Sequence, residues 1–272
     1  MSAPTVTSQG RTNPVKTETE LRRELAAVYR LLAHFKMTDL IFTHVSVRLP
    51  GPEHHFLINP YGLLFEEITA SNLVKIGLDG ELVEPSEYHV NPAGFVIHGA
   101  IHEARTDAQC VLHTHTKAGC AVAAQEQGLL PLNQISMEFY NRVGYHDYEG
   151  IALNTAERVR LVEDLRDHPA MILRNHGLLT VGESAAEAFL RMFYLEKACD
   201  IQIAAQASAT CAFHRPRSPS IRRGSSPARP PTTSPRPGLR DGVGGAAADA
   251  GPDRPRVQGL NSATRMTGAI TS

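Results

Sequence analysis

The chain has 272 residues, of which 42% are hydrophobic and 20% charged, and this composition suits a globular protein with its own core. The net charge of −1 gives no bias toward nucleic acid or membranes, and no apolar run is long enough for a membrane-spanning helix. The four cysteines form no Cys-x-x-Cys pair, and the N-terminus lacks the apolar stretch of a secretion signal. We therefore expect a cytoplasmic protein with reduced thiols and with neither membrane nor nucleic-acid partners.

Arginine and proline are concentrated at the C-terminal end. Residues 208–272 hold ten Arg, three Asp, no Lys and no Glu, so they carry +7 and leave −8 for residues 1–207. Nine of the 18 prolines lie in the same stretch, which we expect to be disordered. A solvated tail, a basic arm for nucleic acid or anionic lipid, and the product of a shifted reading frame all fit this composition. The predicted organisation is a disordered N-terminus over 1–18, one folded domain over 19–207 and this tail.

Helices and strands alternate along the predicted domain. Capping boxes at Thr17–Glu20 and Ser184–Glu187 mark two helix starts, and Asn91-Pro92 and Asn154 mark two more. The predicted helices cover 17–35, 91–105, 118–125, 154–166 and 184–207, and the predicted strands cover 41–50, 55–60, 108–112, 171–174 and 178–181. This order predicts an α/β fold in which helices cover the faces of a central sheet.

Three of the 13 histidines form a pattern typical of a metal site. His113 and His115 flank one residue at the end of a predicted strand, so their side chains point to the same face. His176 lies in the turn between two later strands. Two imidazoles from a strand end and one from a turn can supply three ligands of a tetrahedral metal site with an open fourth position. A hydrogen-bonded core or surface group is the alternative interpretation.

A second pair, His98 and His102, lies four residues apart on one face of a predicted helix. This pair lacks the Glu of a His-Glu-x-x-His zinc motif, so we expect a polar helix face or hydrogen bonds from the helix to the core. The histidines beside turn residues or near helix ends are expected to be exposed, and these are His34, His54, His55, His168 and His214.

Five segments resemble the class II aldolase/adducin family, and they are FTHVSVRLPGPEHHFLINPYG, ITASNLVKI, NPAGFVIHGAIH, VLHTHT and ILRNHGLLTVG. They occur in order, and the likeness covers residues 19–207. The resemblance implies a three-layer α/β/α fold with a mostly antiparallel sheet, and a cyclic homotetramer with sites at subunit interfaces. In the sugar-phosphate aldolases and epimerases of the family the matching histidines bind zinc, which implies that His113, His115 and His176 are metal ligands.

Two departures from the aldolases bear on the substrate. The aldolases carry a Glu or Asp 19 residues before the first metal histidine, and this chain has Gly94 there; Glu87 could replace it only along a different backbone path. Where the aldolases bind a substrate phosphate, the chain has Thr43-His44 and Pro92-Ala93, and proline and alanine side chains offer no donor. We therefore do not expect a sugar-phosphate substrate. His44 and Gly62 are the candidates for substrate binding.

The resemblance implies a metal-dependent, aldolase-type lyase that acts on a small hydroxy- or keto-carbonyl substrate by polarising its carbonyl and stabilising an enolate. Zn²⁺ is the expected metal, with Fe²⁺ as the alternative. Glu138 is the first candidate for the proton acceptor, because family members direct its segment toward a neighbouring subunit's site. Tyr140, Tyr145 and His146 are the other candidates for acid/base work.

Two other functions stay open at this point. The run Asn-Pro-Ala-Gly-Phe resembles the adducin side of the family, whose bacterial branch includes non-haem iron(II) oxygenases. An iron(II) oxygenase or decarboxylase of an aromatic keto acid is therefore one alternative. A non-catalytic adducin-like binding protein is the other, although adducins have lost the metal histidines that this chain keeps.

Overall fold

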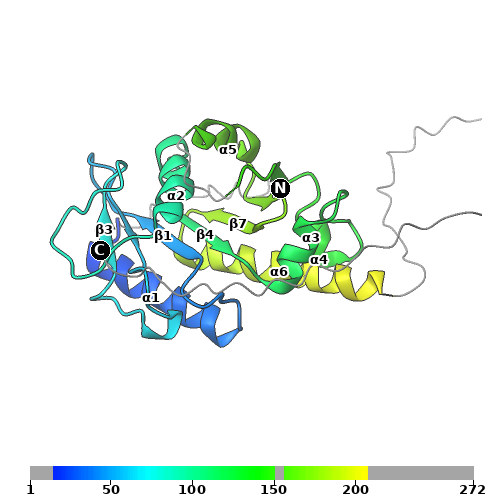
Figure 1. Cartoon of the computed structure of the whole chain (residues 1–272), viewed down its shortest axis with the longest axis horizontal. Helices are drawn as coiled ribbons and strands as arrows, with labels where there is room; N and C mark the ends of the chain where they lie inside the picture. The colour runs from blue at the N-terminus through cyan, green and yellow to red at the C-terminus, as the bar shows by residue number, and fades with distance from the viewer. Residues whose placement is uncertain (1–14, 151–155, 208–272) are drawn as a thin grey trace, which may run out of the picture. The chain divides into compact units, whose positions relative to one another are not determined.

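The computed structural model describes residues 15–150 and 156–207, which form helices on both faces of one sheet (Figure 1). The helices are α1 (Glu18–His34), α2 (Pro92–Ala104), α3 (Lys117–Ala123), α4 (Gln134–Met137), α5 (Glu157–Leu165) and α6 (Ala185–Gln206). The strands are β1 (His44–Arg48), β2 (Phe56–Ile58), β3 (Val74–Ile76), β4 (Cys110–Thr114), β5 (Val143–His146), β6 (Ala170–Leu173) and β7 (Gly177–Gly182). Within these ranges no helix has the length and apolar character that crossing a bilayer requires.

The seven strands lie in the order β3-β2-β1-β4-β7-β6-β5. Every neighbouring pair is antiparallel except β5 and β6, which run parallel. The predicted three-layer fold with a mostly antiparallel sheet is therefore confirmed. The register places His44 of β1 directly opposite His113 of β4. Because side chains that face each other across an antiparallel pair lie on the same side of the sheet, these two imidazoles are neighbours.

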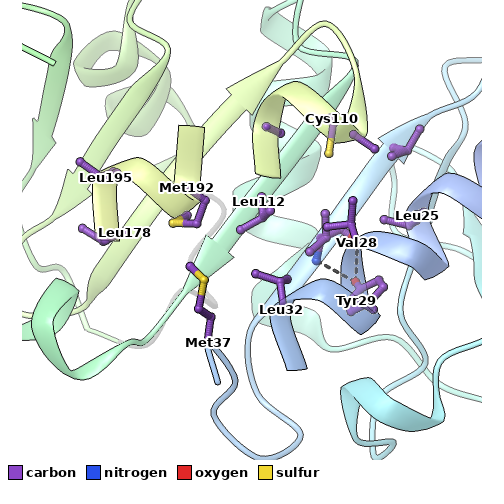
Figure 2. Packing of buried hydrophobic residues seen from close by; sticks show 14 of the residues in the cluster. Leu25, Val28, Tyr29, Leu32, Met37, Cys110, Leu112, Leu178, Met192 and Leu195 are labelled. Carbon is purple, nitrogen blue, oxygen red and sulfur yellow. Dashed lines mark hydrogen bonds between the residues drawn. The ribbon is translucent and has the colours of Figure 1, made fainter. Parts of the chain in front are cut away.

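Each face of the sheet has its own apolar core. In β4, Cys110 and Leu112 pack toward α1 and α6 (Figure 2). Val111 packs instead against residues of α2 and α5, and these two helices lie on the opposite face of the sheet (Figure 1). The same alternation in β1 turns Val45 and Val47 toward α1. It leaves the polar residues His44 and Ser46 on the face that α2 covers. This polar strip between the sheet and α2 leads to the histidine cluster.

Helix α1 begins with the predicted capping box. The Thr17 hydroxyl accepts a hydrogen bond from Glu20 N, and the Glu20 carboxylate accepts one from Thr17 N. Farther along α1, the buried Tyr29 hydroxyl accepts from Val45 N (2.7 Å) and lies 2.8 Å from Asn59 Oδ1. Figure 2 shows Tyr29 beside Val28 and Leu32 in this core. The tyrosine therefore joins α1 to the strand that carries His44.

Several predicted boundaries move in the structure. Strand β1 begins later than the predicted strand 41–50, because Leu40 and Thr43, which precede it, adopt positive φ values of 51° and 67°. At α6, Ser184 caps Glu187 N as predicted, but the Glu187 carboxylate accepts from Glu183 N instead of from Ser184 N. Helix α1 begins one residue before the predicted domain. The predicted Asn154 cap and the predicted tail lie outside the described residues.

Candidate metal centre

Three imidazoles meet where β4 ends and β7 begins. His113 is on β4, His115 follows that strand, and His176 lies in the turn between β6 and β7. One nitrogen from each ring lies within 4.8 Å of the other two. The ring centroids are 4.6 Å apart for His113 and His115, 4.7 Å for His113 and His176, and 4.8 Å for His115 and His176. The structure thus brings together the three histidines that the sequence pattern selected.

Two of the rings are oriented through their Nδ1 atoms. His113 Nδ1 lies 2.8 Å from the Leu178 carbonyl oxygen, and His115 Nδ1 lies 2.9 Å from Asp39 Oδ2. Because a carbonyl and a carboxylate only accept hydrogen bonds, both Nδ1 atoms donate, and in the neutral rings the proton-free nitrogens are Nε2. These two Nε2 atoms lie 2.9 Å apart. Two facing lone pairs at this distance repel each other unless a cation or a proton lies between them.

The donor set fits a divalent metal ion. Zinc–nitrogen bonds of about 2.0–2.1 Å in tetrahedral geometry place ligand nitrogens roughly 3.3 Å apart. This separation falls between the 2.9 Å of the His113–His115 pair and the 4.8 Å within which all three nitrogens lie. A carboxylate behind a ligating histidine is the usual way of fixing the tautomer and orientation of the ring, and Asp39 stands in that place. His113, His115 and His176 would therefore hold the ion, with Asp39 and Leu178 behind them.

The turn that carries His176 is tightly packed against β4. A Cβ at Gly177 would overlap the Thr114 carbonyl oxygen and would lie 3.1 Å from His115 Cδ2. On the other side, the Cys120 thiol donates to the His176 carbonyl at 3.0 Å. Glycine at 177 therefore allows the close approach that completes the cluster.

Burial favours the neutral form of two of these imidazoles, those of His113 and His176. The pKa of His113 is held well below its usual value by burial and then by the neighbouring His176 and His115. Burial, followed by the effect of His115, lowers the pKa of His176 to about 4. Neutral imidazole is the form that binds metals, so at neutral pH these groups need not lose a proton first.

His44 lies next to the cluster, in the space that a side chain at position 94 would take. Its ring centroid is 5.4 Å from that of His113, and a Cβ added to Gly94 would lie 3.0 Å from His44 Cδ2. Position 94, where the aldolases carry a carboxylate, is thus a glycine, and the His44 imidazole lies in the space that a side chain there would take. Gly62, the other predicted substrate-binding residue, lies in the turn after β2 at φ +98°, and its role stays a prediction.

The acid/base candidates lie apart from the three histidines. Glu138 lines a cavity of about 160 Å³ with Phe139, Leu190 and Tyr194. Tyr140, which is 42% exposed, lines a separate cavity. Neither lining includes one of the three histidines. A role for either residue in this chain's own site therefore has no support from these cavities, and a role in a neighbouring subunit's site stays a prediction.

The other two acid/base candidates, His146 and Tyr145, form hydrogen bonds inside the protein. His146 Nδ1 lies 2.8 Å from Asp164 Oδ2, and His146 Nε2 lies 3.2 Å from Glu157 Oε1. Both ring nitrogens are thus occupied, which disfavours proton transfer to substrate by His146. The Tyr145 hydroxyl accepts from Leu129 N at 3.1 Å, which is a packing role.

Two residues near the cluster, Asp39 and Ser46, were not predicted from the sequence. Asp39 lies in the turn before β1, 76 residues from its partner His115, and carries no local motif. Ser46 bonds both His98 and His102, the helical pair for which hydrogen bonds to the core were expected. That expectation is confirmed, because both histidines are fully buried. Alternation along β1 is the one pattern that places Ser46 on the same face as His44.

Comparison with known proteins identifies the family. The sequence model of the Class II Aldolase and Adducin N-terminal domain matches residues 23–203. The crystal structure of an aldolase II superfamily protein from Pseudomonas syringae superposes with a TM-score of 0.72 and 56% identity, covering 76% of this chain and 84% of that one. An L-fuculose 1-phosphate aldolase from Glaciozyma antarctica PI12 superposes with a TM-score of 0.66 and 32% identity, covering 73% and 78%. Alpha-adducin from Rattus norvegicus is 45% identical over 197 residues, which are 71% of this chain and 27% of the adducin. The chain belongs to the class II aldolase/adducin family.

Proposed function

We propose that this protein is a metal-dependent, aldolase-type lyase for a small hydroxy- or keto-carbonyl compound. His113, His115 and His176 hold the metal, with Zn²⁺ in first place and Fe²⁺ as the alternative. The observation that carries the proposal is the pair of proton-free Nε2 atoms 2.9 Å apart, each fixed by an acceptor behind its ring. The similarity to an L-fuculose 1-phosphate aldolase supports the same class of chemistry.

The residues of the chain prepare the site in two ways. A bound divalent cation supplies a Lewis acid that polarises a carbonyl oxygen and offsets developing negative charge. Asp39 and the Leu178 carbonyl hold the rings of His115 and His113 in the tautomer that leaves Nε2 free for the ion. Burial of His113 excludes water from one side of the site, whereas the His115 side chain, at 25% exposure, marks the side open to a substrate.

The proposed site also needs a proton acceptor, and we propose that a neighbouring subunit supplies it. Glu138 is an exposed residue at the C-terminal end of α4, and the homotetramer that the family resemblance implies would bring this segment to a neighbouring subunit's site. Light scattering of the full chain measures the assembly. A monomer with full lyase activity would contradict this part of the proposal.

The test of function uses protein purified without a histidine tag. We expect about one equivalent of zinc per chain, and zinc-dependent cleavage of at least one compound in a panel of small hydroxy-carbonyl substrates. His115→Ala should abolish both, whereas His34→Ala, which changes an exposed histidine at the end of α1, should change neither. Substoichiometric metal that His115→Ala does not reduce would contradict the proposal.

An adducin-like binding role is the second candidate, because alpha-adducin is 45% identical to the chain. The same experiment separates the two functions, since a binding protein needs no bound metal and shows no turnover. Oxygen consumption with Fe²⁺ and an aromatic keto acid would instead identify the oxygenase alternative.

A further inference from the structure

A continuous chain of buried polar side chains runs from the histidine cluster into the interface between α2 and the sheet. His44 Nδ1 lies 2.7 Å from His98 Nε2, and His98 Nδ1 lies 2.5 Å from Ser46 Oγ. Ser46 Oγ lies 2.7 Å from His102 Nε2, and His102 Nδ1 lies 3.2 Å from the Ala108 carbonyl oxygen. Three of the four side chains are fully buried and His44 is 3% exposed. None of these four side chains has been given a role in the proposed lyase chemistry.

The chemistry of the last acceptor fixes every proton in the chain. The Ala108 carbonyl oxygen can only accept, so His102 Nδ1 carries a proton and His102 Nε2 does not. Ser46 Oγ then donates a hydrogen bond to His102 Nε2 and accepts one from His98 Nδ1. Because the proton of His98 is on Nδ1, His98 Nε2 accepts a hydrogen bond, and His44 Nδ1 donates it. His44 Nε2 is therefore the nitrogen that carries a lone pair.

The surroundings of the His44, His98 and His102 rings favour the neutral form of each. His44 is buried, and its hydrogen-bond partner is the His98 ring rather than a carboxylate. Burial lowers the pKa of His98 and lowers that of His102 to about 3. Each imidazole thus has one donor and one acceptor, and no ring can donate from both nitrogens.

The lone pair on His44 Nε2 is available for a ligand. This atom makes no hydrogen bond with any residue in the described ranges, and the ring that carries it lies beside His113. The preceding residue, Thr43, is a β-branched residue at φ 67°, and its buried hydroxyl also has no partner among the described residues. Strained backbone and an unpaired buried polar group together are typical of a binding site rather than of a stable core.

We propose that His102, Ser46 and His98 are positioning residues that hold His44 with its proton on Nδ1, so that His44 Nε2 accepts a hydrogen bond from a substrate hydroxyl. This inference rests on the proposed function, since it places the hydroxyl beside a carbonyl at the three histidines. We therefore expect the substrate to be a hydroxy-carbonyl rather than a keto-carbonyl compound. A phosphate dianion has no proton to donate and would meet a lone pair at this position.

The direct test is the tautomer of each histidine, measured by ¹⁵N NMR of protein labelled in its histidine rings. We expect the proton of His44, His98 and His102 on Nδ1 in the wild-type protein, with or without zinc. Ser46→Ala removes the link between His98 and His102, so His44 should shift to a mixture of tautomers while His102 keeps its proton on Nδ1. Ser71→Ala, which removes an exposed hydroxyl, is the matched control and should leave all three unchanged.

A wild-type His44 with its proton on Nε2 would overturn the inference. A Ser46→Ala protein with unchanged circular dichroism and an unchanged His44 tautomer would overturn the positioning role. The wild-type measurement needs neither a variant nor a metal, so it decides the tautomer even if Ser46→Ala fails to fold or zinc does not bind. Absent zinc binding would contradict the proposed function instead.

Glycolate and acetate, which differ by one hydroxyl, test the substrate class on the zinc-loaded protein. Glycolate should move the His44 Nε2 resonance toward that of a hydrogen-bonded nitrogen, and acetate should not. Ser46→Ala should reduce the preference for glycolate over acetate by about 2- to 10-fold, the size of one hydrogen bond. Equal movement with both ligands, or an unchanged preference in Ser46→Ala, would overturn the assignment of His44 as a hydroxyl acceptor.

Discussion

The Nε2 atoms of His113 and His115 face each other at 2.9 Å, although the Nδ1 atom of each ring is already committed to an acceptor behind it. This arrangement costs free energy in an empty site and is relieved when a cation takes up both lone pairs. The energetic balance of the cluster therefore favours metal binding, and the residues behind the rings contribute to it by fixing the tautomers.

Removing the carboxylate behind His115 should weaken metal binding without removing a ligand. Asp39→Ala is expected to lower zinc affinity by about 10- to 100-fold, because His115 loses the acceptor that fixes its tautomer. Competition with a chelator measures the change. Asp200→Ala is the control, since this α6 carboxylate is 65% exposed and pairs with Lys197 at 3.8 Å. Equal affinity in the two variants would contradict a supporting role for Asp39.

Gly94→Ala should destabilise the protein through His44. The new methyl group would lie 3.0 Å from His44 Cδ2 and 3.2 Å from Ile58 Cδ1, and overpacking costs about 1–3 kcal/mol in the free energy of unfolding. This cost exceeds the roughly 0.5–1 kcal/mol by which alanine is favoured over glycine inside a helix such as α2. In a His44→Ala background the same change should cost less, because the ring is gone. Urea unfolding of the four proteins gives the coupling, expected at about 0.5–3 kcal/mol. Strict additivity would show that His44 does not fill the space at position 94.

Stability should fall in mild acid because of His102. Its folded-state pKa of about 3 results from burial and from the nearby Arg48 charge, and it lies below the ordinary value of 6.5. The unfolded chain therefore gains a proton that the folded chain does not bind, so the contribution is complete above pH 6.5 and is lost as the pH falls toward 3. Between pH 7 and pH 5 the free energy of unfolding should drop by roughly 2 kcal/mol from this group.

Urea unfolding of metal-free protein at both pH values checks this dependence. His102→Gln should reduce the drop between the two pH values by roughly 2 kcal/mol, whereas His34→Gln should leave it unchanged, because His34 is exposed. A His102→Gln protein as sensitive to acid as the wild type would mean that His102 is protonated in the folded state.

Tyr29→Phe should loosen the strand that carries His44. The change leaves Val45 N without the hydroxyl that it donates to at 2.7 Å, and an unpaired buried group costs about 1–3 kcal/mol in unfolding free energy. Tyr61→Phe, at a residue that is 39% exposed, should change stability by less than about 0.5 kcal/mol. Thermal unfolding compares the two, and similar melting temperatures would contradict the role of Tyr29.

The sequence predicted those parts of the fold that depend on local patterns. The capping box at Thr17 and the apolar period of α1 fixed that helix, and the His113-Thr-His115 spacing found the cluster because strand geometry is strictly alternating. Strand β5 was not predicted, because four residues that include Gly144 carry too little pattern. Helix α4 is likewise too short for a recognisable period.

The surroundings of the site depend on contacts that no local pattern reports. Asp39 reaches His115 across 76 residues, and Ser46 reaches His98 across 52. Only the sheet register, which pairs His44 with His113, shows that these residues share one region. The sequence singled out His44 and Gly94 separately, and the structure shows that the glycine leaves room for the imidazole.

X-ray absorption at the zinc edge of the loaded, untagged protein tests the shared metal most directly. We predict about three imidazole nitrogens at roughly 2.0–2.1 Å from the ion, with one imidazole lost in His176→Ala. A first shell of oxygen or sulfur atoms, or a spectrum that His176→Ala leaves unchanged, would show that the three histidines do not bind one metal.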